Sequence, residues 1–482
     1  MTLDSRTRWL ALYVLCLGDL MIVLDGTIVN VALPSIRDDL GFSETSLAWI
    51  VNAYLLTFGG FLLLGGRLGD LFGHRRLFLS GISLFTVASL LCGLANSQEF
   101  LIVARAVQGL GGAIVSAVAL SLVMTLFTET ADRAKAMGIF GFVLSGGGVA
   151  GVLLGGVLTD VLNWHWIFLV NIPVGFVVYG LTLRLLPASP GIAKGRLDIA
   201  GAISVTVALM LAVYAIVNGN DQGWTSAQTL GLLAGAVVLV IVFLAVELRV
   251  SAPLVPLGLF RNHNVSTANV VGVLMAGGMF AWFFFSALYL QRVLGYTPLE
   301  VGLAYLPSMV VWGTASLQSD KLVMRFGIKT PLLVGLGLMT ASLLLFARVP
   351  VDGNVFLDVL PGTLALGLGA GIAFNPILLA AMSDVGPQEA GLASGVVNTS
   401  FMMGGALGLA ILASLADSRT TSLRDTSSEA SALNSGYHLA FLGGAIFVAL
   451  AAAVAAALLR PAQAPAHGGE EAHGVPAAAR AE

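Results

Sequence analysis

Fourteen long apolar stretches follow one another along the 482-residue chain, and they constrain its fold more than any other feature. A membrane-spanning helix needs about 20 mostly apolar residues. The stretches run approximately over 9–33, 47–65, 77–96, 100–126, 138–160, 166–187, 199–217, 228–247, 265–291, 300–318, 330–349, 355–381, 391–416 and 437–459. Only 10% of the residues are charged, whereas soluble proteins carry about 25%. The sequence therefore predicts an all-α polytopic membrane protein with 14 transmembrane helices.

The Lys and Arg residues predict how the helices are oriented. When the N-terminus is placed in the cytoplasm, 17 of the 23 Lys and Arg residues fall on the cytoplasmic side, as the positive-inside rule requires. Both termini are then cytoplasmic. The connecting segments are short, and the longest covers about 20 residues at 417–437. No basic domain for nucleic acid is present, and the short polar start predicts a retained first helix rather than a cleaved signal peptide.

An internal repeat divides the chain. The segments at 65–81 and 318–335 align when Gly73 is set on Gly327, which is an offset of 254 residues. We therefore predict a six-helix bundle at 9–187, two linking helices at 199–247, a second six-helix bundle at 265–459 and a disordered cytoplasmic tail at 460–482. Repeated bundles that rock about a central site are a common plan of transporters. A purely structural repeat is the alternative.

Two carboxylates interrupt the first apolar stretch. Asp19 lies near its middle and Asp25 lies six residues further on, about 9 Å along a helix and about 120° around it. Such residues are costly in lipid and usually mark a functional cavity, so both are expected to face one wide cavity. Arg105, at a comparable depth in 100–126, is the expected partner of Asp25. We predict that Asp25 and Asp19 carry protons, with Arg105 modulating Asp25; structural hydrogen-bonding acids are the alternative.

Glycine-rich segments predict a charged cytoplasmic turn and a face for close helix packing. The segment GGRLGDLFGHRR supplies Gly66, Asp70, Gly73, Arg75 and Arg76 in a tight cytoplasmic turn, where charges near helix ends would latch one bundle to the other. The alternative is that these cations only set the topology.

In 146–156, Gly147, Gly151 and Gly155 recur every four residues, followed by Gly156. That spacing predicts a flat face for close helix approach.

Several polar or amphipathic side chains lie at the depth expected of a substrate cavity. They are Asn52, Tyr54, Gln108, Trp282, Asn375 and Asn398. Aromatic and methionine-rich segments such as 275–290 and 401–405 would provide an adaptable surface for flat, apolar molecules. For each residue alone, ordinary packing is the alternative.

These motifs, in this order, resemble the major facilitator superfamily, specifically its 14-helix drug:proton antiporter family. The likeness covers about residues 9–460 and rests on LDGTIVNVALPSI, GGRLGDLFGHRR, ARAVQGLGGA, GVAGVLLGG, WHWIFLVNIPVG, LVPLGLFRN, YLQRVLGYTPLEVGLAYLP and AGLASGVVNTS. It implies export of drugs from the cytoplasm or inner leaflet in exchange for protons.

The sequence departs from the family pattern at several positions. Val152 stands where a proline is usual, Phe401 and Met402 stand where Arg-Gln is frequent, and Asp19 stands where relatives are commonly uncharged. An extra acid at position 19 would admit a cationic substrate or a second proton.

Other functions remain to be weighed. A dedicated exporter of one metabolite or lipid would carry the same motifs. A membrane enzyme is disfavoured because the chain has no HExxH, CxxC or P-loop motif. A sensor is disfavoured because the loops are small. The resulting expectation is a monomeric, multi-pass exporter of the bacterial inner membrane that uses protons, small-molecule substrates and the lipid bilayer, without another cofactor, a metal or nucleic acid.

Overall fold

The computed structural model describes residues 4–127, 129–187, 191, 197–250, 253–383, 385–386 and 389–460. Every regular element in these ranges is helical. The first elements are α1 (Ser5–Leu40), α2 (Glu44–Phe72), α3 (His74–Gly93), α4 (Gln98–Leu126), α5 (Thr130–Val161), α6 (Trp166–Leu169), α7 (Asn171–Leu185), α8 (Ile199–Gln222) and α9 (Ala227–Glu247). The others are η1 (Leu257–Arg261), α10 (His263–Leu288), η2 (Tyr289–Val293), α11 (Pro298–Phe326), α12 (Lys329–Phe346), η3 (Val355–Val359), α13 (Leu360–Met382), α14 (Ala390–Leu423) and α15 (Glu429–Leu458).

Each predicted apolar stretch overlaps a long helical segment. Twelve segments within the described ranges are long and apolar enough to cross a membrane, with α6 and α7 forming one of them. The two remaining stretches fall on α5, of 32 residues, and on α11, of 29 residues. The charged residues of α11 lie near its two ends, at Glu300, Asp320, Lys321 and Arg325.

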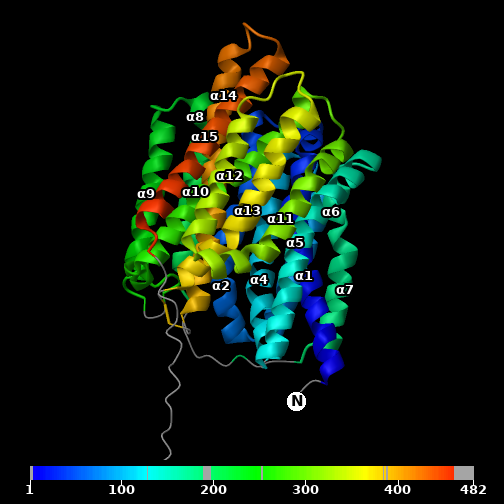
Figure 1. The fold of residues 1–482 in the computed structure, drawn as a ribbon, viewed down its shortest axis with the longest axis vertical. Helices are drawn as coiled ribbons and strands as arrows, with labels where there is room; N and C mark the ends of the chain where they lie inside the picture. Colours follow the sequence, from blue (N-terminus) through cyan, green and yellow to red (C-terminus); the bar gives the residue numbers. More distant parts are fainter. Residues whose placement is uncertain are drawn as a thin grey trace, which may run out of the picture.

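One predicted loop is largely helical. The segment 417–437 was expected to connect two helices as a loop, but α14 continues to Leu423 and α15 begins at Glu429. Ser428 caps α15 by accepting a hydrogen bond from the Ser431 main-chain N–H, and Tyr437 is buried against Phe285. The two helices therefore extend beyond the apolar region as a hairpin at the top of Figure 1.

The long helices pack into two groups. Helix α1 packs against α4, α5 and α7, while α2 and α3 pack against α4; α1–α7 form the first half. Helix α10 packs against α14 and α15, α12 against α13 and α15, and α11 against α13; α10–α15 form the second half. The halves meet where α2 contacts α14 and α5 contacts α11. Helix α8 packs against both α2 and α14, and α9 covers α8 at the edge of the molecule (Figure 1).

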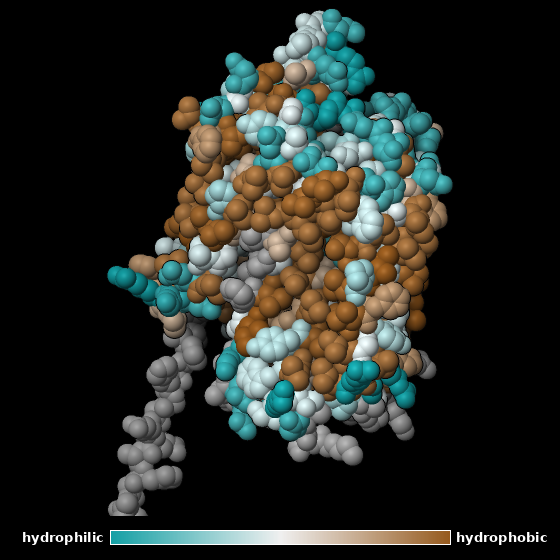
Figure 2. Space-filling model, turned by 90° about the vertical axis from the view of Figure 1, so that its right-hand side faces the viewer, coloured by the Kyte–Doolittle hydropathy of each residue, from teal (hydrophilic) through white to brown (hydrophobic). Residues whose placement is uncertain are grey.

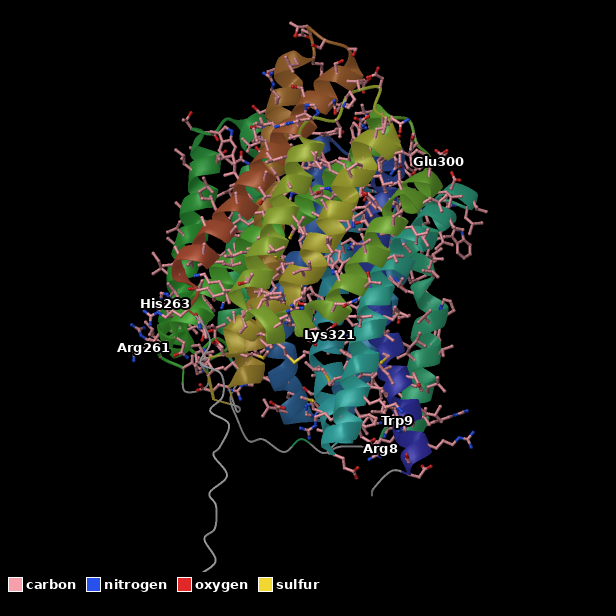
Figure 3. All side chains as sticks on the ribbon, viewed as in Figure 1. Arg8, Trp9, Arg261, His263, Glu300 and Lys321 are labelled. Carbon is pink, nitrogen blue, oxygen red and sulfur yellow. The ribbon has the colours of Figure 1, made fainter. Side chains whose placement is uncertain are left out.

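The surface of the molecule matches a membrane environment. Figure 2 shows a broad hydrophobic belt with hydrophilic side chains gathered above and below it. Arg8, Arg261 and Lys321 lie in the lower half of Figure 3, whereas Glu300 lies near the upper end. The last described residues return to the lower end, since Lys329 at the start of α12 donates a hydrogen bond to the Leu459 carbonyl oxygen at 3.2 Å. Both ends of the described chain therefore lie at one end of the bundle, the terminal end, and the opposite end is the far end. The predicted tail at 460–482 falls outside the described residues after Arg460.

Candidate functional site

A buried polar cluster surrounds the carboxylate of Asp25. Asp25 is 0% exposed and Arg105 is 1% exposed. The Arg105 Nη1 donates a hydrogen bond to Asp25 Oδ2, which closes a salt bridge. The other carboxylate oxygen, Oδ1, accepts hydrogen bonds from Gln108 Nε2 at 2.7 Å and from Asn171 Nδ2 at 3.1 Å. The predicted pairing of Asp25 with Arg105 is present in the structure.

The guanidinium of Arg105 is fixed by further partners. Its Nε donates to the Ile50 carbonyl oxygen at 3.0 Å, and its Nη1 also donates to Gln108 Oε1 at 2.7 Å. The guanidinium lies over the Tyr54 ring, 4.3 Å from its centroid. Such a fork of planar donors is what distinguishes arginine from lysine in buried ion pairs. The cluster is therefore held in one geometry by α1, α2, α4 and α7.

Local helix geometry explains why these side chains meet. Arg105 and Gln108 are three residues apart, so they lie on one face of α4. Gly109 lets α2 approach that face, because a Cβ atom at position 109 would collide with the Tyr54 carbonyl oxygen. Asn171 is the first residue of α7, and Ser89 of α3 accepts a hydrogen bond from Gln108 at 2.7 Å.

The expected exposure of the acids to one cavity is wrong for this conformation. Asp25 is sealed inside the first half because α4 and α7 surround it with hydrogen-bond donors. Asp19 is 4% exposed and accepts a hydrogen bond from Ser116 Oγ on α4. The two acids share no hydrogen-bond partner among the described residues, so they form separate sites on α1 rather than one wide cavity.

The predicted latch residues lie in the first half alone. Gly73 ends α2 with φ +91°, a backbone conformation that favours glycine, which confirms the predicted tight turn. Asp70 is half exposed, at 51%, and pairs with His74 at 3.4 Å. Arg75 donates to the Leu183 carbonyl oxygen at 2.7 Å. Gly66 faces open space, and Arg76 begins the exposed face of α3. No described contact joins these side chains to the second half.

The glycine face of α5 packs as the spacing predicts. A Cβ atom at Gly147 would lie 2.7 Å from Leu20 Cδ1, one at Gly151 would lie 3.0 Å from the Leu24 carbonyl oxygen, and one at Gly155 would lie 2.7 Å from the Ile28 carbonyl oxygen. All three contacts are made to α1, the helix that carries both acids. The close approach of α5 therefore fixes the acid-bearing helix from the opposite side.

Gly156 makes a different contact. A Cβ atom there would lie 2.7 Å from the Pro298 carbonyl oxygen at the start of α11, so Gly156 joins the two halves. A Cβ atom at Gly302 of α11 would lie 3.0 Å from the Val152 carbonyl oxygen. Near the same end, Gln291 Nε2 donates to the Val31 carbonyl oxygen at 2.9 Å. The halves are therefore in main-chain contact toward the far end.

The proposed cavity residues divide into distinct environments. Asn398 lines a small hollow in the second half together with Met275, Phe374, Ile377, Leu378, Val397 and Phe401. Asn375 is half-buried, and its Nδ2 donates to the Ser316 carbonyl oxygen at 3.4 Å. Phe401 packs between Phe280 and Phe374. These residues keep the aromatic and amide chemistry expected of a substrate surface.

Four other proposed cavity residues are buried. Gln108 belongs to the Asp25 cluster, and Tyr54 lies under Arg105. Trp282 is fully buried among Phe283, Tyr305 and Phe346. Asn52 is also fully buried, and neither its amide nitrogen nor its oxygen has a hydrogen-bond partner. Their positions along the helices do not decide whether they meet a cavity, because that depends on which face of the helix each side chain occupies.

Two polar residues of the site were not singled out from the sequence. Asn171 lies within the segment WHWIFLVNIPVG, and a polar residue inside an apolar stretch was a usable signal. Ser116 lies 11 residues after Arg105 on α4, which is three turns and places both on one side of that helix.

A molecule of two packed helical groups in an apolar belt, with an ion pair sealed inside one group, is a polytopic membrane protein of the transporter type. The family model of the Major Facilitator Superfamily matches residues 15–409. The chain belongs to the Major Facilitator Superfamily.

Similar proteins include a puromycin resistance protein of Streptomyces alboniger, which is 40% identical over 413 residues, 85% of this chain and 82% of that protein. A cephamycin export protein of Amycolatopsis lactamdurans is 36% identical over 452 residues, 93% and 92% of the two chains. Among solved structures, a bacterial homologue of the human lysosomal transporter Spinster, in an inward-facing and unoccupied conformation, has the same fold. Its TM-score is 0.67 at 16% identity, and the match covers 96% of this chain and 100% of that one. The protein is thus a multi-pass membrane protein of the bacterial plasma membrane, with drug-resistance and export proteins as relatives.

Proposed function

We propose that the protein is a proton-coupled exporter that exchanges drugs or other hydrophobic or cationic molecules for protons by alternating access. The proposal includes 14 membrane-crossing helices, with α5 and α11 among them, and cytoplasmic termini. The observation that carries it is the Asp25–Arg105 pair, which is fully buried at membrane depth and held by a polar cluster. Buried ionisable pairs of this kind are costly in lipid and mark proton and substrate pathways.

The contacts of α1 suggest how proton binding reaches the interface. A proton on Asp25 removes the negative charge that pairs with Arg105 Nη1, which weakens that contact, while the hydrogen bonds of the guanidinium to Ile50 and Gln108 remain. The electrostatic attraction between α1 and α4 becomes weaker as a result. Farther along α1, Val31 is bonded to Gln291 of the second half. A shift of α1 is therefore transmitted to the contact between the halves.

The pattern of contacts supports an inward-open state. Near the far end, α5 meets α11 through main-chain atoms, and α1 accepts a hydrogen bond from Gln291 of η2. At the terminal end, Asp70 is half exposed and bonded only within the first half. With a cytoplasmic terminal end, this state would receive substrate from the cytoplasm, and closure would bring the turn at Gly73 toward the second half.

The driving force is adequate for export. Moving one charge through about 100 mV yields about 2.3 kcal/mol, and one pH unit adds about 1.4 kcal/mol. One proton would therefore sustain roughly a 500-fold gradient of a neutral solute.

The relatives favour antibiotics as cargo. One has a name that states puromycin resistance, and the other is a cephamycin exporter. The second name also supports the alternative of a dedicated exporter of one metabolite. Phe401 packs with Phe280 and Phe374, so the surface beside Asn398 suits an apolar, ring-containing molecule.

The test uses the full chain in proteoliposomes with an imposed pH gradient. Puromycin flux and proton flux are measured together for the wild type, for Asp25→Asn and for Asp19→Asn. We expect coupled fluxes in the wild type and loss of at least about 10-fold in Asp25→Asn, since roughly that much follows from removing one charged partner of a buried pair.

The two acids give separable outcomes. If Asp19 serves a cationic cargo, Asp19→Asn loses transport of cations but keeps proton-driven transport of neutral drugs. Undiminished antiport in Asp25→Asn would refute the assigned proton site. Puromycin flux that ignores the pH gradient in the wild type would refute proton coupling altogether.

A further inference from the structure

A second pair of buried carboxyl groups lies far from Asp25 in sequence, on the two helices between the halves. Asp198 immediately precedes α8, and Glu247 is the last residue of α9. Asp198 is 5% exposed and Glu247 is 4% exposed. Buried carboxylates are normally paired with cations or neutralised by a proton, so these two residues require a physical explanation.

Each carboxyl group uses one oxygen to hold the main chain. Asp198 Oδ1 accepts a hydrogen bond from the Gly201 N–H at 2.7 Å, which caps the start of α8. Glu247 Oε2 accepts a hydrogen bond from the Val255 N–H at 3.2 Å, which ties the end of α9 to the connection with α10. The two anchors fix the direction of both side chains.

The remaining oxygens converge on one point without a partner. Asp198 Oδ2 and Glu247 Oε1 are buried, and neither accepts a hydrogen bond. A Cβ atom built on Gly201 would lie 3.0 Å from Glu247 Oε1 and still closer to Asp198 Oδ2. Because position 201 is glycine, the two oxygens approach the same space above the first turn of α8.

The surroundings of the pair offer little compensation for charge. Leu64 of α2, Ala202 of α8 and Leu254 form a buried apolar cluster beside it, with Leu197 and Val255 packed against them. On the other side, Val255 packs against a second apolar cluster that includes Val396 of α14. These side chains cannot stabilise two negative charges at close range.

The charged groups described in the neighbouring elements are not bonded to the pair. The described candidates are Arg67 and Asp70 on α2, Arg249 after α9, Arg261 in η1 and Glu389 before α14. Within the described ranges, none of the ion pairs includes Asp198 or Glu247. Among the described residues, no cation compensates the two carboxyl groups.

We propose that Asp198 and Glu247 form a second proton-binding site, in which one proton is held between Asp198 Oδ2 and Glu247 Oε1. One carboxyl group then donates its O–H to the other, which remains a carboxylate. This arrangement satisfies both unpartnered oxygens at once and leaves a single negative charge, as in carboxyl dyads that cannot both ionise. The site is independent of the proposed transport cycle at Asp25.

The proton stabilises the contact between the start of α8, the end of α9 and the α9–α10 connection. When the pH rises and the proton leaves, two like charges face one another in an apolar site. The folded state then binds more protons than the unfolded state in this range, so stability falls as the pH rises. The same contact region packs against Leu64 of α2, so its loosening would free the α8–α9 pair from the first half.

The test compares unfolding of the full chain in nanodiscs between about pH 6 and about pH 9. Glu247→Gln replaces the shared proton with an amide N–H that donates to Asp198, while its amide oxygen still accepts from Val255. Asp198→Asn is the reciprocal variant. We expect the fall in the Tm of the wild type with pH to shrink to half or less in either variant.

A control variant separates this site from other titrating groups. Glu300→Gln alters the exposed N-terminal cap of α11, where Glu300 accepts a hydrogen bond from the Thr297 N–H. We expect this variant to keep the pH dependence of the wild type. Infrared difference spectra should also show a protonated-carboxyl band near neutral pH that is lost in Glu247→Gln.

Three results would overturn the proposal. The Tm of the wild type and both amide variants could fall in parallel with pH. The protonated-carboxyl band could survive in Glu247→Gln. Sodium, rather than protons, could stabilise the wild type, which would indicate a metal-cation site. None of these outcomes bears on Asp25, because no transport is measured.

Discussion

The ion pair inside the first half shows how much one side chain can determine at the residue scale. Arg105 serves an acid, an amide oxygen and a main-chain carbonyl oxygen with one guanidinium. Removing one partner of a buried pair leaves an uncompensated charge, which costs about 3–5 kcal/mol. Replacing both partners removes that penalty.

We therefore expect Arg105→Ala to lower the free energy of unfolding by about 3–5 kcal/mol, and the double variant with Asp25→Asn to lower it by markedly less. The reason is that the double variant has asparagine at position 25, so no buried negative charge is left without a partner when Arg105 is absent. Denaturant unfolding of the four proteins in one detergent would measure the coupling. Equal losses in the single and double variants would show that the pair is not coupled.

Arg105→Lys tests the planar fork separately. A lysine retains the charge but cannot reach Asp25, Gln108 and the Ile50 carbonyl oxygen together, because its ammonium is a single point of attachment. We expect substrate transport to fall at least about 10-fold, as for loss of one charged hydrogen bond, while the folded protein is retained. A lysine variant that transports like the wild type would show that charge alone suffices at this position.

At the scale of elements, the packing of α5 against α1 depends on main-chain approach. A Cβ atom at Gly151 would meet the Leu24 carbonyl oxygen, whereas Gly148, three residues earlier on the same helix, faces open space. Overpacking of a close contact costs about 1–3 kcal/mol.

We expect Gly151→Ala to lower thermal stability and slow transport, and Gly148→Ala to be neutral in both measurements. The comparison isolates the contact because both variants gain the same helix propensity. Equal behaviour of the two alanine variants would show that the approach of α5 to α1 does not matter for function.

The sequence predicted the elements better than it predicted their faces. Apolar length located every long helix, since lipid admits few other solutions for a spanning chain. The pairing of Asp25 with Arg105 followed from matched depth. Depth could not show that Trp282 and Asn52 are fully buried, because the packing around each face of a helix depends on neighbours that composition does not reveal.

Some of the missing information was available in the spacing. Gln108 lies three residues after Arg105, so it shares a helix face with that residue, and it joins the acid cluster rather than the substrate surface. The polar segment at 417–437 shows a feature that the spacing of residues and their hydropathy did not reveal. Its helices continue beyond the apolar belt because Ser428 caps α15 and Tyr437 packs on Phe285, which hydropathy does not register.

At the scale of the whole molecule, the contact between the halves toward the far end should open in each transport cycle. Gly156 of α5 and Leu299 of α11 are close enough for cysteines to be cross-linked, since a Cβ atom at position 156 would lie 3.0 Å from the Leu299 Cα. We expect oxidation of the double cysteine variant to abolish transport and a reducing agent to restore it. The native thiols, Cys16 and Cys92, are both buried and free.

The single variants Gly156→Cys and Leu299→Cys, treated with the same oxidant, provide the controls, because a Cβ atom at position 156 would itself lie 2.7 Å from the Pro298 carbonyl oxygen. Each should transport equally well before and after oxidation. If the cross-linked double variant continued to transport, alternating access through separation of α5 from α11 would be wrong.

Helix α8 touches both halves, and this has a mechanical consequence. Deep in the belt, the Thr206 side chain packs against Gly60 of α2; at the far end, Asn220 Nδ2 donates to the Ser414 carbonyl oxygen at 2.7 Å and to Asp417 at 3.1 Å. In the proposed transport cycle the two halves move relative to each other. Helix α8 cannot follow both halves, so its contact with either α2 or α14 must break in each cycle. The hydrogen bonds of Asn220 lie at the far end of the bundle, where water can replace them when they break. Water cannot replace the packing contact of Thr206 with Gly60 inside the apolar belt. Helix α8 should therefore move together with α2 and limit the displacement of α14.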